Sequence, residues 1–565
     1  MMLTFISYNT PTIKLKGSLM RLEKVFIKKF RSFENVSLVL SKNDFPDVFS
    51  IASKNGGGKS TLLQFIFIML SSFKDEGKKE FLKNLFYGNN INKKKDDSIA
   101  TFNISHNDNE YTLEFLYTKN KKTTELVNLD IFLDEKDLEK KISIAENTRI
   151  KYKNVINLKK ELEATDRITP VLIHYLEATR EFVNSSALDR MYKKALTSTH
   201  LEDFQKYLES ITRREDANFD DIAELEIIYN NLQQRKNLLQ ASLKDKGMLY
   251  ITHLYENDLV LLLKTDMPED LLEELTNKVY LNAPMSQIFL FLREEEKNSI
   301  FNSFGKRRTF ATYEDYVRRT KDLLKTFYTY DFASTELILN SFEKAFIEDK
   351  KIKKATGSYG DKYDKLVVEL NNFLEGKEIS EDEESKRVIF KIKNSSQELR
   401  PEDLSHGELK KLSIYIWLKY IVPNDAIILM DEIDIALHPK WQYQIINDII
   451  QWSDGQFLLA THSPQILSST YFKNLIKIDN KDSKIIVTQY EKPPLDRDIN
   501  TIIMEIMGAP AFPENLFELH DKYKNLAMKG KKDSKEALIL KKQILEYESE
   551  NSSFFQELNF DLELM

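Results

Sequence analysis

Four short motifs, far apart in the chain, contain residues whose types and spacing could carry out chemistry. They are S-K-N-G-G-G-K-S-T at Ser53–Thr61, L-S-H-G-E at Leu404–Glu408, A-I-I-L-M-D-E at Ala426–Glu432 and F-L-L-A-T-H-S at Phe457–Ser463. A lysine in a glycine-rich loop, two adjacent carboxylates and a histidine after an apolar run are a set suited to phosphoryl chemistry. The motifs together predict a nucleotide-binding site assembled from distant segments.

The first motif has the pattern of a phosphate-binding loop. Glycine lets backbone N–H groups approach the phosphates, and the helix that follows attracts anions at its N-terminus. Lys59 would reach the β- and γ-phosphates, Ser60 would ligate Mg²⁺, and Thr61 would contribute near the α-phosphate. Ser53 stands where a glycine is usual, which weakens the match slightly, and a plain glycine-rich turn before a buried helix is the alternative. The residues predicted to bind ATP here are Ser53, Lys54, Asn55, Gly56, Gly57, Gly58, Lys59, Ser60 and Thr61.

The later motifs supply the hydrolytic residues. Asp431 ends an apolar strand and could hold Mg²⁺, and Glu432 could act as the general base toward the attacking water. His462 follows another apolar run and could contact the γ-phosphate. Lys59, Glu432 and His462 are therefore the predicted catalytic residues. A strand that ends in an acidic turn and a structural histidine are the alternatives.

The motif Leu404–Glu408 opens a predicted helix. Ser405, His406, Gly407 and Glu408 would form an anion site at the helix N-terminus. The alternative is an ordinary helix start, because Ser405 and Glu408 also have the spacing of a capping box.

The surrounding segments predict an α/β protein. Short apolar runs indicate strands, and the apolar segment Ser60–Leu70 indicates a buried helix. Residues Glu378–Glu384 are predicted to form an exposed acidic turn. The strands are expected at Leu22–Ile27, Val36–Leu40, Val48–Ala52, Thr101–Leu133, Val171–Tyr175, Val388–Ile392, Ile476–Ile478 and Ile485–Gln489. The predicted units are an extension (1–19, with Met20 as an alternative start to Met1), a first lobe (20–180), a compact helical insertion (181–385), a second lobe (386–492) and a helical tail (493–565).

Composition narrows the class of protein. The chain has 565 residues, 82 basic and 89 acidic, with a net charge of −7 and no cysteine. The lack of cysteine excludes disulfides and thiol chemistry and fits a cytoplasmic protein. No signal peptide or membrane span is expected, and the eight histidines form no metal-ligand pattern.

One basic stretch is the best candidate for nucleic-acid contact. Its charges are interleaved with Phe304, Phe310 and Tyr313, which could stack on bases. A solvated charged surface is the more common meaning of such a run. The basic residues are Lys306, Arg307, Arg308, Arg318 and Arg319.

Taken together, these motifs resemble the ATP-binding-cassette ATPases of the SMC-like soluble branch. The large insertion between Lys59 and Ser405 and the segment Phe30–Phe33, which includes Arg31, are similar to that branch. The sequences D-E-I-D-I-A-L-H-P at Asp431–Pro439 and T-H-S-P at Thr461–Pro464 resemble Septu-type and retron-associated ATPases of anti-phage systems. The resemblance implies a mixed sheet with a P-loop core, an antiparallel β subdomain, a helical insertion and a helical tail.

The same resemblance implies partners and a mechanism. ATP and Mg²⁺ would be bound between two subunits, with the Ser405–Glu408 motif of one completing the site of the other and Arg31 near the nucleotide. A small HNH-type nuclease would be the partner, joined in a retron by a reverse transcriptase with its RNA–DNA hybrid. Two features depart from the general cassette pattern: His438 stands where a dimer-contact aspartate is usual, and no glutamine lid is evident.

Three functions compete at this point. The leading hypothesis is a dimerising ATPase, without a nuclease activity of its own, that regulates a partner nuclease in anti-phage defence. The second is an SMC-like ATPase that acts in DNA repair or at DNA ends. The third is a scaffold in which the nucleotide is structural and turns over little.

Overall fold

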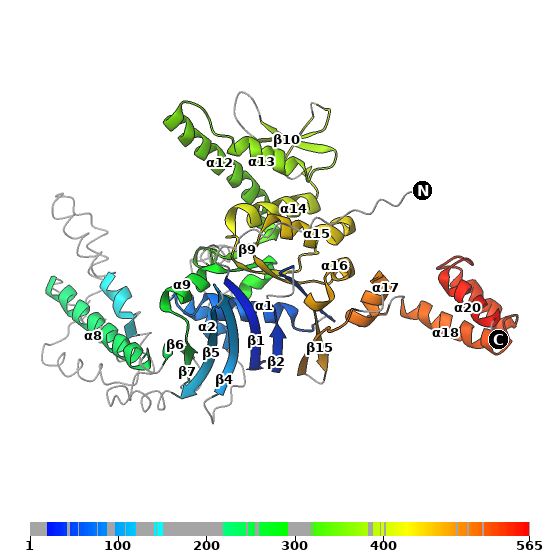
Figure 1. Ribbon diagram of the computed structural model, residues 1–565, viewed down its shortest axis with the longest axis horizontal. Helices are drawn as coiled ribbons and strands as arrows, with labels where there is room; N and C mark the ends of the chain where they lie inside the picture. The colour runs from blue at the N-terminus through cyan, green and yellow to red at the C-terminus, as the bar shows by residue number, and fades with distance from the viewer. Residues whose placement is uncertain are drawn as a thin grey trace, which may run out of the picture.

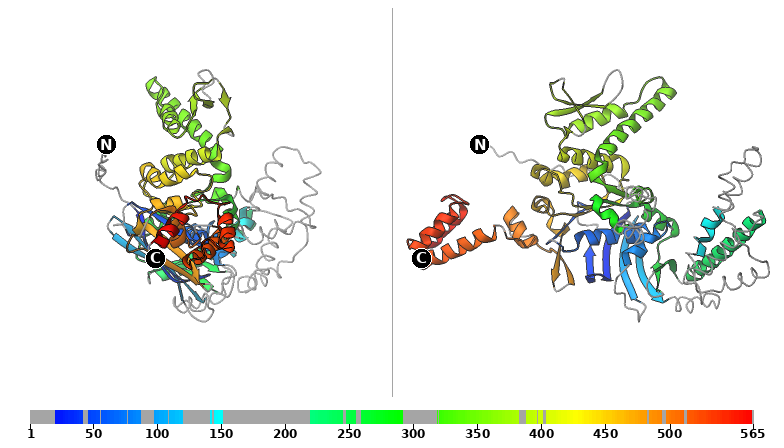
Figure 2. Two further views of the ribbon diagram at one scale, coloured as in Figure 1. Left: turned by 90° about the vertical axis from the view of Figure 1, so that its right-hand side faces the viewer. Right: turned by 180° about the vertical axis from the view of Figure 1, so that it is seen from behind.

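The computed structural model contains two large β-sheets with helices between and around them. An arm of helices with a third, three-stranded sheet and a group of C-terminal helices project from this body (Figures 1 and 2). The residues that the structure describes are 20–41, 46–54, 56–75, 77–86, 97–107, 109–119, 141–142, 144–150, 219–244, 247–254, 259–291, 318, 320–381, 388–395, 397–400, 403–481, 484–493, 497–510 and 513–563. Within these residues, no helix combines the length and the apolar character that a membrane crossing requires.

The larger sheet has seven strands in the order β16-β15-β3-β14-β13-β8-β9. Neighbouring strands run parallel, except that β16 is antiparallel to β15. The strands are β3 (Val48–Ser53), β8 (Val279–Ala283), β9 (Phe327–Thr329), β13 (Ile427–Asp431), β14 (Gln456–Ala460), β15 (Leu475–Lys481) and β16 (Lys484–Gln489). Parallel strands place their carboxyl ends at one edge, so the residues after β3, β13 and β14 emerge side by side.

The smaller sheet is antiparallel, with the order β2-β1-β4-β5-β7-β6. Its strands are β1 (Met20–Phe30), β2 (Phe33–Val39), β4 (Asp97–His106), β5 (Asn109–Lys119), β6 (Met248–Leu254) and β7 (Leu259–Thr265). Helix α1 (Lys59–Ser71) lies between the two sheets. Its Phe65 packs on Phe30 and Phe102, while Phe67 packs on Phe327 of the larger sheet. This position explains why α1 is apolar nearly all round.

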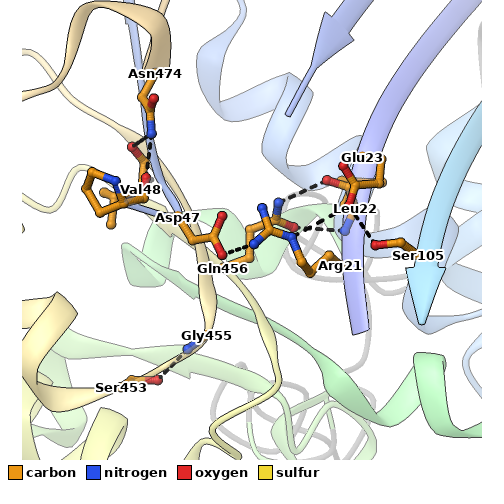
Figure 3. Close-up of polar contacts among 11 residues, drawn as sticks. Arg21, Leu22, Glu23, Asp47, Val48, Ser105, Ser453, Gly455, Gln456 and Asn474 are labelled. Atoms are coloured by element: carbon orange, nitrogen blue, oxygen red, sulfur yellow. Dashed lines mark hydrogen bonds and ion pairs between the residues drawn. The ribbon is translucent and has the colours of Figure 1, made fainter. Parts of the chain in front are cut away.

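Polar contacts join the two sheets at the end opposite the loop after β3 (Figure 3). Gln456, the first residue of β14, accepts from the N–H of Leu22 and donates to its carbonyl, both at 2.9 Å. Arg21, which is 6% exposed, forms an ion pair with Asp47 beside β3. These contacts fix β1 against β14, and thereby fix the antiparallel sheet relative to the strands that carry the site.

The opposite face of the larger sheet is covered by α14 (His406–Ile416), its π-helical continuation η4 (Trp417–Ile421), α15 (Pro439–Trp452) and α16 (Pro464–Ser469). An arm rises from α14 (Figure 1). The arm comprises α12 (Tyr330–Thr356), α13 (Lys362–Asn371) and a small sheet of β10 (Lys377–Glu381), β11 (Val388–Ile392) and β12 (Glu398–Leu399). At its base, Tyr328 stacks on Trp417 with ring centroids 5.6 Å apart, and Glu369 accepts from the Tyr415 hydroxyl at 2.8 Å.

The C-terminal helices form a separate projection with a hydrophobic cluster of their own (Figures 1 and 2). They are α18 (Glu514–Met528), α19 (Lys535–Ile544) and α20 (Ser553–Glu563), and α17 (Ile499–Thr501) with the π-helical turn η6 (Ile502–Ile506) connects them to the body. Other elements in the described part of the chain are α2 (Lys79–Phe86), α8 (Phe219–Lys244), α9 (Glu269–Lys278) and the short 3₁₀ helices η2 (Met285–Leu290) and η5 (Phe472–Asn474).

The structure confirms the predicted α/β class, its mixed and antiparallel sheets and the strands β1, β2, β3, β11, β15 and β16. It differs inside the stretch expected to be a helical insertion, because β6 and β7 extend the antiparallel sheet and β8 and β9 extend the larger one. The acidic turn expected at Glu378–Glu384 is wrong in its first part: Lys377–Glu381 is strand β10, paired with β11. Residues 1–19 and the strand expected at Val171–Tyr175 lie outside the described residues. The domain boundaries themselves stay a prediction.

Candidate nucleotide site

The loop between β3 and α1 has the backbone of a phosphate-binding loop. Gly56 and Gly58 have φ values of 73° and 95°, in the left-handed region that favours glycine. Gly57 has no room for a side chain, because an added Cβ would lie 2.5 Å from Ser53 Oγ. Ser53 itself does not have a positive φ, and its hydroxyl donates to the Lys54 carbonyl at 2.8 Å. The serine therefore fits where a glycine was expected.

Helix α1 begins at this loop with its donors directed toward any bound anion. Gly58 is its N-cap and provides no side-chain hydrogen bond. The N–H groups of the first turn, which includes Ser60 and Thr61, and the positive end of the helix dipole are therefore not satisfied by a cap. This arrangement is an anion-binding site of the type found at helix N-termini.

Lys59 lies where the loop, β13 and β14 converge. Its ammonium donates to Ser53 Oγ at 3.0 Å and lies 2.8 Å from Nε2 of His462. Burial lowers the pKa of Lys59, and the nearby carboxylates of Asp431, Asp434 and Glu432 oppose that change. Burial and the Lys59 charge lower the pKa of His462. A neutral His462 ring can accept from Lys59 and hold the lysine in place.

Asp431 is 1% exposed and ends β13 at the same edge. Burial raises the pKa of its carboxyl group, whereas hydrogen bonds from Ser60 and Gln287 and the Lys59 charge act in the opposite direction. Its Oδ1 atom is buried without a hydrogen-bond partner among the described residues. A buried carboxylate oxygen beside a serine hydroxyl has the ligand chemistry of Mg²⁺, which takes one or two carboxylates plus substrate phosphates.

Glu432 occupies a strained turn directly after the strand. Its φ of 52° is uncommon for a residue with a side chain and costs on the order of 1–2 kcal/mol. The turn is fixed by the Glu432 N–H, which donates to the Ala460 carbonyl at 3.0 Å. Lys410 of α14 donates to the carbonyls of Glu432 at 3.0 Å and Ile435 at 2.7 Å. The strained backbone is thus held from two neighbouring elements.

Gln287 is a site residue that the sequence did not reveal. It lies in η2, directly after β8, and its amide donates to Asp431 Oδ2 while accepting from Gln64 of α1 at 2.8 Å. Sequence reasoning missed it because the run from Val279 to Ala283 was placed inside a helical insertion. A short apolar run followed by Pro284 is the signal that could have marked another parallel strand ending at the site.

The Ser405–Glu408 motif has the geometry of a capping box. Ser405 Oγ accepts from the Glu408 N–H at 3.2 Å, and the Glu408 carboxylate accepts from the Ser405 N–H at 2.8 Å. Lys377 of the arm also bonds this carboxylate, at 2.8 Å. An added Cβ on Gly407 would lie 2.6 Å from the Ala436 carbonyl, so α14 packs directly on the turn after Glu432. Within the described contacts, the motif meets its own chain here and not the loop that contains Lys59.

The other residues singled out in the sequence lie away from Lys59 or outside the described residues. His438 is the N-cap of α15, where its Nδ1 accepts from the Lys440 N–H at 3.2 Å. Arg31 has a φ of 51° in the exposed turn between β1 and β2. Phe33, the buried first residue of β2, lies beside the P-loop, since a Cβ added to Gly58 would be 3.2 Å from its ring. Arg318 is described only as an exposed helical residue. Those outside the described residues are Asn55, Lys306, Arg307, Arg308 and Arg319.

A P-loop after one parallel strand, a histidine after the adjacent strand and a buried aspartate at the end of the next strand form the arrangement of a P-loop nucleotide-binding site. The family described as "AAA domain" matches residues 24–247. A second family, described as "AAA domain, putative AbiEii toxin, Type IV TA system", matches residues 277–468. The two matches together include the P-loop, Asp431 and His462, and they imply that the chain binds ATP.

Three relatives are a Septu protein and two retron ATPases. "Retron Vc95 probable ATPase" of Vibrio cholerae serotype O1 biovar El Tor is 29% identical over 27% of this chain and 32% of its own length. "Septu protein PtuA" of Bacillus mycoides (strain KBAB4) is 27% identical over 27% of this chain and 22% of its own length. "Retron Ec83 probable ATPase" of Escherichia coli is 28% identical over 24% and 25%. The matched segment thus spans no more than about a third of each relative.

Solved structures give a weaker likeness. The Smc head domain with an extended coiled coil bound to the C-terminal domain of ScpA, from Pyrococcus furiosus, is 13% identical with a TM-score of 0.30 over 83% of this chain and 97% of that chain. The SmcHead bound to the C-winged helix domain of ScpA has a TM-score of 0.32 at 13% identity, over 83% and 98%. The family and relative matches identify the chain as an AAA/ABC-type ATPase that is distantly related to Septu PtuA and the retron ATPases.

Proposed function

We propose that this protein binds and hydrolyses Mg²⁺-ATP as a dimer and thereby regulates a partner nuclease in anti-phage defence in the cytoplasm. The observation that carries the proposal is the convergence of Lys59, His462 and Asp431, from three elements, at one edge of the sheet. The related retron and Septu proteins support the biological setting.

The residues at the sheet edge suit hydrolysis of a γ-phosphate. Lys59 and the N–H groups of α1 would bind the phosphates, with Ser60 and Asp431 as ligands of Mg²⁺. When bound, Mg²⁺ would neutralise charge that develops on the phosphate oxygens. Glu432 would accept a proton from the attacking water, and His462 would hydrogen-bond the γ-phosphate. Gln287, whose amide donates to Asp431, would lie beside the bound Mg²⁺ and help to hold this carboxylate in place.

Dimerisation would complete this site with the Ser405–Glu408 motif of a second copy. The motif opens helix α14, whose positive N-terminal end can contact an anion. Ile435, 46% exposed in the turn after Glu432, adds apolar surface to the same region. A two-fold pair would contain two equivalent sites, and ATP would favour the closed pair because it contacts both subunits only there. Higher assemblies of such dimers are compatible with this arrangement.

The nuclease partner is proposed from the Septu and retron relationship. An HNH-type protein would supply the cleavage activity, joined in a retron by a reverse transcriptase with its RNA–DNA hybrid. The ATPase would then act as the regulatory subunit. Co-purification of the chain with the product of a neighbouring HNH gene is the direct check on this partnership.

The variant Glu432→Gln tests the enzymatic and dimeric parts together. It removes the proposed base but keeps the side-chain volume, so turnover should fall by about 100-fold or more while ATP still binds. The variant should accumulate ATP-bound dimers, visible by light scattering after size-exclusion chromatography. The matched control is Glu491→Gln, an exposed glutamate outside the site.

Normal turnover by Glu432→Gln would contradict the assignment of the base. Bound nucleotide without any turnover in the unmodified protein would favour the scaffold function. Hydrolysis that is stimulated by DNA ends and needs no nuclease partner would favour the DNA-repair function.

A further inference from the structure

Asp434 connects the turn after Glu432 with the segment that contains His462. Its Oδ1 atom accepts from the Thr461 hydroxyl at 2.5 Å and from the backbone N–H of His462 at 3.3 Å. Both donors follow β14, whereas Asp434 follows β13. One carboxylate oxygen therefore ties together the two loops that emerge from neighbouring parallel strands.

A second tie between these loops comes from Gln442 of α15. Its amide group donates to the carbonyls of Asp434 at 3.2 Å and Leu437 at 2.8 Å. Its amide oxygen accepts from the Ser463 hydroxyl at 2.7 Å. Ser463 also caps α16 by accepting from the Ile466 N–H at 3.1 Å. The backbone on both sides of His462 is thus held by side chains from elsewhere in the fold.

These contacts hold the segment from which the His462 ring extends. Its Nε2 atom is 2.8 Å from the Lys59 ammonium. Of the residues on either side of it, Thr461 is hydrogen-bonded to Asp434 and Ser463 to Gln442. A shift of the backbone by about 1 Å is enough to misplace a group that must meet a reacting phosphate. The hydrogen bonds of Asp434 and Gln442 restrict such a shift.

We propose that Asp434 is a positioning residue for hydrolysis, which holds His462 at the γ-phosphate through the Thr461 hydroxyl and the His462 N–H. Gln442 supports the same loop from α15. The proposal rests on the proposed ATPase function and adds a residue to it. It requires an oxygen acceptor at position 434, and the negative charge is secondary.

The test compares two substitutions at position 434 by steady-state ATP hydrolysis and by binding of a non-hydrolysable ATP analogue. Asp434→Ala removes the acceptor, so kcat should fall about tenfold or more with analogue affinity within about threefold of the original. Asp434→Asn keeps an amide oxygen in the same place and should retain most of the turnover. The matched control is Asp454→Asn at an exposed aspartate in the loop before β14.

A protein that lacks the His462 side chain separates a positioning effect of Asp434 from a general loss of stability. In His462→Ala protein, Asp434→Ala should cause little further loss of turnover, because the group that it positions is already absent. Gln442→Ala should show the same dependence on His462 and provides a second variant if Asp434→Ala does not fold.

Equal losses with and without the His462 side chain would overturn the proposal, as would an Asn variant as slow as the Ala variant. Full turnover by Asp434→Ala would overturn it while leaving the ATPase function intact. No hydrolysis by the unmodified protein would overturn both.

Discussion

The packing of Gly407 decides whether an alanine at this position stabilises or destabilises the protein. Gly407 is the second residue of α14, so alanine there gains at most the preference of about 1 kcal/mol that it has over glycine in a helix interior. The added Cβ, however, would lie 2.6 Å from the Ala436 carbonyl and 3.1 Å from the Trp441 ring. Because Cβ atoms essentially never approach within 3.0 Å, α14 or the turn must move by at least about 0.4 Å.

Overpacking of this kind costs about 1–3 kcal/mol, so Gly407→Ala should destabilise the protein by about 1 kcal/mol in net terms despite the gain in helix propensity. The loss of stability should be confined to α14 and the turn on which it packs. Hydrogen exchange of the amides in α14 and in residues 432–437 should become faster, because the bonds from Lys410 to Glu432 and Ile435 span the same contact.

The measurement is hydrogen exchange by mass spectrometry together with the midpoint of chemical unfolding, both without nucleotide. His406→Ala is the matched control, since it changes the adjacent, exposed helix position and should stay within about 0.5 kcal/mol. Slower exchange in α14 and a higher unfolding midpoint for Gly407→Ala would refute the close packing of α14 on this turn.

Two further predictions concern the buried charges of the site. Lys59→Ala should lower the affinity for ATP by about tenfold or more, measured by calorimetry against the surface control Lys484→Ala, because Lys59 is the cation between the loop and His462. Unchanged affinity would contradict the P-loop assignment. Asp431→Asn should stabilise the nucleotide-free protein at neutral pH, because burial raises the pKa of Asp431 and the charged form costs stability as the pH rises through that raised value. The measurement is unfolding of both proteins between pH 4 and 8, and the gain in stability should disappear near pH 4, around the pKa of an unfolded aspartate. A gain in stability that does not depend on pH would show that burial does not destabilise the charged carboxyl group.

Much of the site could be predicted because its residues follow recognisable strands. Val48–Ser53, Ile427–Asp431 and Gln456–Ala460 are fully buried parallel strands, and such strands are continuous apolar runs in the sequence. The residue types that follow them are restricted by phosphate and metal chemistry. The structure accordingly brings Lys59, Asp431 and His462 to one edge of the sheet, and their roles stay a prediction.

Gln287 and the extra strands were missed because the sequence marks them only weakly. The run that forms β8 is short and is followed by a short 3₁₀ helix, so its periodicity does not distinguish it from a helical segment. Strands β6 and β7 pair with each other, and β7 pairs with β5, more than 130 residues earlier in the chain. Pairing over such a distance leaves no local mark in the sequence.

The role of His438 shows how a departure from a family pattern can be absorbed. An N-cap needs a side-chain acceptor for the N–H groups of the first turn, and Nδ1 of His438 provides it for Lys440 at 3.2 Å. Substitution at this position therefore preserves the start of α15, the helix from which Gln442 reaches the loops on both sides. The coupling between the turn after Glu432 and its neighbours is carried instead by Asp434, Gln442 and Lys410. Since Lys410 belongs to α14 and Asp434 contacts the His462 loop, a movement of α14 in the proposed dimer would be transmitted to the proposed hydrolytic residues through these hydrogen bonds.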